Sequence, residues 1–159
     1  MHVYLLMIVS FILGFSLEII AQQGLWLWLQ PEWILLLIVY WLIYHPGYFS
    51  IFSCFTAGLA ADIIYGTLLG KHALIYVGIA LLIISLHKRI QLYTLGKMAV
   101  AMFFLTLAFL LFNFLSMHSM RFILHREILM FFTKACTTSL IWILAIQCIK
   151  TRQSIILHD

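Results

Sequence analysis

Apolar residues fill most of this chain, in runs that short polar or turn-forming segments separate. Six such runs cover residues 3–21, 33–44, 48–65, 73–86, 98–117 and 128–149. A helix needs ~20 mainly apolar residues to cross a bilayer, and most of the runs come close to that length. The pattern therefore predicts an all-α fold: a polytopic transmembrane helical bundle of about six spans with short loops, forming a single membrane domain over residues 1–159.

The two prolines fall at the two ends of the second run. Pro31 precedes Glu32, and proline followed by an acid suits the first turn of a helix. Pro46 stands between a histidine and a glycine, which predicts a tight turn. The same run carries the amphipathic rings of Trp33, Tyr40 and Trp41, which we expect at the membrane–water interfaces.

The third run contains an acid in an otherwise apolar setting. Gly58, Asp62 and Gly66 recur every four residues, so on a helix they share one face. Small residues on such a face let another helix approach closely in a membrane, with the carboxyl group turned toward protein. We therefore predict that Gly58, Asp62 and Gly66, together with Gly70 in the following turn, mediate helix packing or partner contact.

The stretch of residues 30–74 resembles the bacterial rod shape-determining protein MreD family. It reads PEWILLLIVYW, then HP, then GLAADIIYGTLLGKHAL. Outside this stretch the resemblance is limited to chain length and hydrophobic pattern. The matching positions are Pro31, Trp33, Tyr40, Trp41, Pro46, Gly58, Asp62, Gly66, Leu69, Gly70, Ala73 and Leu74.

The resemblance implies a multi-pass protein of the bacterial inner (cytoplasmic) membrane that takes part in lateral wall synthesis and cell shape. It also implies partners: an MreC-like bitopic protein and, through it, the MreB filament, the RodA glycosyltransferase and a class B penicillin-binding transpeptidase. The leading hypothesis is thus a non-enzymatic scaffold of the rod-shape machinery. The alternative is a small-solute-binding membrane protein, such as a substrate-capture subunit of a vitamin transporter.

The amino-acid composition restricts the classes of protein and of ligand that we expect. The chain is 65% hydrophobic and 9% charged, whereas a soluble domain carries about 25% charged residues. We therefore expect membrane lipid as a partner. We do not expect nucleic acid, because the adjacent pair Lys88–Arg89 is the only local cluster of basic residues.

The three cysteines and seven histidines lack metal-type spacing. No nucleophile elbow, P-loop or dinucleotide fingerprint is present, so we expect neither an enzyme nor a cofactor.

Six spans place both termini on one side of the membrane. The Lys and Arg residues favour cytoplasmic termini by five to three, since cytoplasmic loops carry more of them. On the expected cytoplasmic side lie Lys88, Arg89, Lys97, Lys150 and Arg152, and on the other side lie Lys71, Arg121 and Arg126.

Asp62 has two interpretations, a carboxyl held by polar groups across a helix interface or a proton or ion site. Lys134 could reach the interface, or it could pair with Asp62 or Glu18. Under the packing interpretation we expect Asp62→Asn to be mild and Gly58→Leu to be damaging. Under the other, Asp62→Asn is the damaging change.

Overall fold

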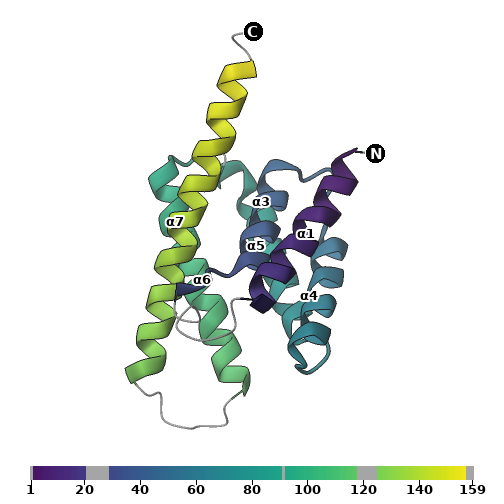
Figure 1. The fold of residues 1–159 in the computed structure, drawn as a ribbon, viewed down its shortest axis with the longest axis vertical. Coiled ribbons are helices and arrows are strands. Elements are labelled where there is room, and N and C mark those ends of the chain that lie inside the picture. The colour runs from purple at the N-terminus through teal and green to yellow at the C-terminus, as the bar shows by residue number, and fades with distance from the viewer. Residues whose placement is uncertain (1, 21–28, 91, 118–124, 157–159) are drawn as a thin grey trace. The chain divides into compact units, whose positions relative to one another are not determined.

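The computed structural model describes residues 2–20, 29–90, 92–117 and 125–156. Over these residues the chain is all-helical and contains no strand, which confirms the predicted fold class (Figure 1). The helices are α1 (His2–Ile20), α3 (Trp33–Tyr44), α4 (Ile51–Tyr65), α5 (Lys71–Ile90), α6 (Leu95–Met117) and α7 (His125–Ile156).

These helices form two compact units. Unit 1 comprises Met1–Ile20 and Trp33–Leu92, and so holds α1, α3, α4 and α5. Unit 2 comprises Ala21–Glu32 and Tyr93–Asp159, and so holds α6 and α7. Within unit 1, α4 packs on α5 and α3 packs on both α1 and α5, while α6 packs on α7 within unit 2.

Helix length separates the six helices into two groups. Four contain segments long and apolar enough to cross a membrane: Val3–Ile20, Lys71–Ile90, Leu95–Leu115 and Ile128–Cys148. The apolar helices α3 and α4 have only 12 and 15 residues. At a rise of ~1.5 Å per residue they extend about 18 and 22 Å, less than the ~30 Å of a hydrocarbon core. The chain is a multi-pass membrane protein, and its exact number of complete crossings remains a prediction.

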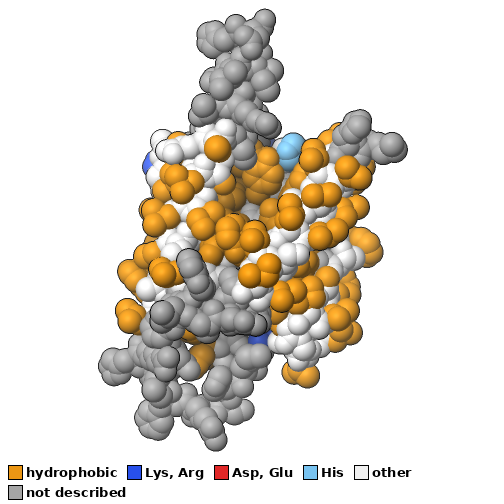
Figure 2. Space-filling view, viewed as in Figure 1, with side chains coloured by type: hydrophobic (Ala, Val, Ile, Leu, Met, Phe, Trp, Pro, Cys, Tyr) orange, Lys and Arg blue, Asp and Glu red, His pale blue; other side chains and the backbone are white. Residues whose placement is uncertain are grey.

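Helix α3 forms the core of unit 1. Ile34, Leu35, Ile38 and Leu42 are each at most 1% exposed, because this helix is apolar on every side. Its neighbour α1 instead exposes large apolar side chains along its length, as a lipid-facing helix does. On the face drawn in Figure 2, hydrophobic side chains are spread over the described surface, with backbone and other side chains between them. The indole of Trp41 on α3 donates a 3.1 Å hydrogen bond to the Ser10 hydroxyl on α1.

Both prolines flank α3. Pro31 is buried and lies two residues before the first residue of the helix, and Pro46 lies two residues after its last. After α3, the amides of Tyr48 and Phe49 donate to the carbonyl of His45, at 3.0 and 3.1 Å, and form the turn that leads into α4. A proline suits this position because it has no N–H to contribute to a continuing helix.

We predict that α3 and α4 both cross the membrane in spite of their length, so that six crossings leave both termini in the cytoplasm. A reporter fused after Asp159 tests this topology. We expect activity from a fusion partner that works only in the cytoplasm, and none from one that works only in the periplasm. The reverse result would show that the number of crossings, or their orientation, is wrong.

Candidate functional site: the Asp62 clasp

The turn between α4 and α5 depends on two glycines in left-handed conformations. Gly66 caps α4 with a φ of 62°, and Gly70 has a φ of 96° just before α5 begins. Residues with side chains rarely adopt such angles, whereas glycine does so without steric cost. The Thr67 amide donates a 3.0 Å hydrogen bond back to the carbonyl of Asp62, which closes the end of the helix.

The Asp62 carboxylate holds this turn together. Its Oδ1 accepts hydrogen bonds from the Thr67 hydroxyl at 2.8 Å and from the His72 amide at 2.9 Å. The same oxygen lies 2.8 Å from Nδ1 of His72. Oδ2 accepts a 2.8 Å bond from the amide of Gly70. We call this set of Asp62, Thr67, Gly70 and His72 the Asp62 clasp.

The clasp is buried, which makes its hydrogen bonds important. Asp62 is 1% exposed and His72 is 6% exposed. The imidazole of His72 also contacts the rings of Tyr65 and Tyr76, with centroid distances of 5.2 and 6.1 Å. A buried carboxylate without partners is very costly, and here each oxygen has at least one donor. These contacts connect the last turn of α4 to the turn that follows it and to the start of α5.

Gly58 lies one helical turn before Asp62, where the backbone of α4 comes close to that of α5. A Cβ atom added at Gly58 would lie 2.3 Å from Cα and 2.5 Å from N of Ala73. Real Cβ atoms essentially never come so close to backbone, so no side chain fits there unless the helices separate. Gly58 and the Asp62 clasp thus act on the same helix pair, one by close contact and the other by hydrogen bonds.

The predicted site residues are divided between these roles. Gly58 and Asp62 face α5, but α4 ends at Tyr65, so Gly66 is not part of the helical stripe. A Cβ at Gly66 or Gly70 would meet nothing within 4 Å in this chain. Both residues serve the turn, and their contact with a partner remains a prediction.

The predicted interfacial aromatics also differ in exposure. Trp41 is buried at 5% exposure against α1, while Trp33 and Tyr40 are partly exposed. The Tyr40 ring packs on Tyr44 and His45 near the end of α3, with centroid distances of 5.2 and 6.1 Å. Their position at a membrane interface remains a prediction.

Sequence reasoning missed His72. The seven histidines were considered only for metal-type spacing, and His72 was not singled out, although it lies buried beside Asp62. A usable signal existed: Asp62 lies four residues before Gly66 and His72 lies two residues after Gly70, on either side of a short glycine-bounded turn. In such a helical hairpin, the last turn of one helix faces the first turn of the next.

Lys134 pairs with neither Asp62 nor Glu18. In unit 2 its ammonium lies 3.1 Å from Oε1 of Glu32. The amide of Glu32 donates a 3.2 Å bond to the Thr138 hydroxyl, which itself donates to the carbonyl of Lys134. In unit 1, Oε2 of Glu18 accepts a 3.4 Å bond from the amide of Ile34, in the first turn of α3. Glu18, Glu32 and Asp62 are thus each bonded to other groups of the chain.

Within the described ranges, no group of three or more His, Cys, Asp or Glu side chains is placed to hold a metal ion. The arrangement described above consists of hydrogen bonds and close backbone contact. It can orient and lock helices.

Comparison with known proteins decides the family. The family model described as rod shape-determining protein MreD matches residues 1–149. The chain belongs to the MreD family. A curated rod shape-determining protein MreD from Haemophilus influenzae is 37% identical over 65 residues. That match covers 41% of this MreD chain and 40% of the relative, so less than half of either protein is aligned. No solved structure matches the chain.

Proposed function

We propose that this MreD-family chain is a non-enzymatic scaffold of the bacterial inner membrane that supports peptidoglycan synthesis by the rod-shape machinery and so helps determine cell shape. The observation that carries the proposal is the family match over residues 1–149, which is nearly the whole chain. The multi-pass helical fold is what a protein acting within the membrane requires.

The geometry of the acids favours a scaffold over a transporter. A proton or ion site needs a carboxylate that can exchange its partners, and such groups in membranes line pathways. Here Asp62 receives hydrogen bonds from the turn and from His72, and Glu32 is paired with Lys134. These bonds stabilise the positions of helices, which is the property that a scaffold needs.

The alternative, a small-solute-binding subunit, requires a concave site with convergent polar groups. The hollow between α1 and α4 in unit 1 has a volume of about 300 Å³. Its lining is mainly apolar, and the hydroxyl of Thr56 within it already donates to the Ser53 carbonyl. The described hollow therefore suits apolar contact better than recognition of a polar solute.

The proposed partners are those that the family resemblance implies. An MreC-like bitopic protein would make direct contact, and through it the chain would act with the MreB filament, the RodA glycosyltransferase and a class B penicillin-binding transpeptidase. Large apolar side chains exposed on α1, α4 and α5 offer surface for partner helices in the bilayer.

Depletion in a rod-shaped host tests the function, and co-purification tests the direct partner. We expect depleted cells to become round, and re-expression of the intact chain to restore rods.

Mild solubilisation should recover an MreC-like protein with the tagged chain, while an unrelated polytopic protein carrying the same tag should not. Depleted cells that stay rod-shaped would overturn the function, and failure to recover the partner with intact, membrane-inserted protein would overturn the direct contact.

A further inference from the structure

A second surface feature lies in unit 2, at the start of α6. A hollow of about 500 Å³ is lined by Tyr93, Gly96, Lys97, Val100 and Ala101. Gly96, Lys97, Val100 and Ala101 recur at intervals of three and four, so they lie along one side of α6, and Tyr93 lies two residues before the helix begins. A Cβ added at Gly96 would meet nothing within 4 Å, so the backbone is open to the hollow there.

Lys97 supplies a positive charge at this hollow. Its side chain is exposed, and among the described residues no carboxylate forms an ion pair with it. Lys134, in contrast, has its charge neutralised by Glu32 within the same unit. Lys97 lies in the first turn of the candidate span Leu95–Leu115, so we expect its ammonium near the membrane surface.

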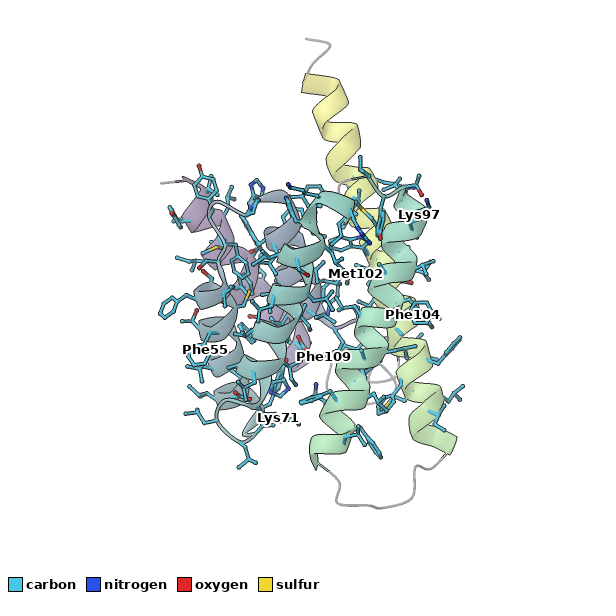
Figure 3. The ribbon with its side chains drawn as sticks, turned by 180° about the vertical axis from the view of Figure 1, so that it is seen from behind. Phe55, Lys71, Lys97, Met102, Phe104 and Phe109 are labelled. Atoms are coloured by element: carbon cyan, nitrogen blue, oxygen red, sulfur yellow. The ribbon has the colours of Figure 1, made fainter. Side chains whose placement is uncertain are left out.

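After Lys97, helix α6 has one exposed face and one buried face. Figure 3 shows Lys97 and Phe104 on one side of the helix, and Met102 and Phe109 on the other. Met102 and Phe109 are buried, at 3% and 5% exposure, whereas Phe104 is 63% exposed. The exposed face therefore begins with a cation at the membrane surface and continues as an apolar strip into the bilayer, through Val100, Ala101 and Phe104.

We propose that this face of α6 binds an anionic phospholipid. The phosphate lies at Lys97, beside the phenol of Tyr93, and an acyl chain lies along Val100 and Phe104. Charge complementarity selects the anionic headgroup, because a cation near the surface attracts anionic lipid. The apolar strip that continues from the hollow selects a lipid over a free phosphate, which would gain nothing from it. This site is independent of the Asp62 clasp and of the proposed scaffold function.

The proposal is tested on the purified full-length chain by titration with phosphatidylglycerol and with phosphatidylcholine, followed by native mass spectrometry. Lys97→Ala should weaken phosphatidylglycerol binding about five-fold, the effect of one basic residue near an anionic surface. Lys97→Arg should restore the binding. Lys88→Ala removes another exposed cation, in the last turn of α5, and should change the binding less than two-fold.

Gly96→Leu provides a second variant that keeps the fold, since its side chain would point into open space. It should fill the hollow and weaken phosphatidylglycerol binding while the melting temperature stays unchanged. Equal losses from Lys88→Ala and Lys97→Ala would show diffuse attraction and overturn the site. Equal binding of phosphatidylcholine, or displacement of the lipid by soluble glycerol phosphate, would overturn the choice of ligand.

Discussion

Gly58→Leu is expected to separate α4 from α5 and to abolish shape control. Even the first atom of a side chain at Gly58 would lie 2.3 Å from Cα of Ala73, so the clash is with backbone and cannot be relieved by a rotamer change. Overpacking of a well-packed contact typically costs ~1–3 kcal/mol, occasionally more. We expect the upper end or beyond, because moving α5 also stretches the hydrogen bonds of the Asp62 clasp.

The chain offers a matched control for this substitution. Gly78 lies on an exposed side of α5, and a Cβ there would meet nothing within 4 Å. Gly78→Leu therefore adds the same side chain to the same helix pair without a clash. Thermal unfolding in detergent and complementation of a depleted strain compare the two variants, with expression checked by immunoblot. A Gly58→Leu protein that melts like Gly78→Leu and supports normal rods would disprove the close contact.

Periodicity located the packing face, but it could not locate the end of the helix. Gly58 and Asp62 were found because they are spaced by one helical turn, and the structure turns both toward α5. Gly66 fits the same spacing, yet it adopts a φ of 62° and terminates α4. Glycine is favoured both on a close-packed face and at a helix C-terminus, so spacing alone cannot distinguish the two uses.

The sequence also could not predict which acidic residue pairs with Lys134. The sequence suggested Asp62 or Glu18 as the partner of Lys134, whereas the structure pairs it with Glu32, which is 102 residues away along the chain. The identity of the partner depends on which segments pack together. Hydrophobic runs of similar composition do not show which of them will be neighbours. Helix length was more informative, because the short second run, residues 33–44, reappears as the 12-residue core helix α3.

Asp62→Asn is expected to be damaging, contrary to the mild effect that helix packing alone suggests. The carboxylate accepts three contacts at Oδ1 and one at Oδ2, all from groups that can donate. An asparagine has one oxygen, so in its better orientation its amide nitrogen faces the N–H of Gly70. A buried donor left unsatisfied costs ~1–3 kcal/mol, and bonds to a charged acceptor are stronger than those to a neutral one. The turn should therefore loosen and the melting temperature should fall.

Thr67→Val serves as the graded control for Asp62→Asn. It removes one donor to Oδ1 and leaves the bonds from Gly70 and from the His72 amide in place. Thr67→Val removes one of the four contacts to a carboxylate that keeps its charge, whereas Asp62→Asn removes the charge from all four and leaves one donor unsatisfied. Thr67→Val should therefore lower the melting temperature less than Asp62→Asn. The same measurements separate structure from transport. If Asp62→Asn lowers stability and shape control together, the carboxylate is structural. If the variant melts like the wild type but fails to restore rods, the structural interpretation of the clasp is wrong, and Asp62 instead acts at a partner contact or as a proton or ion site.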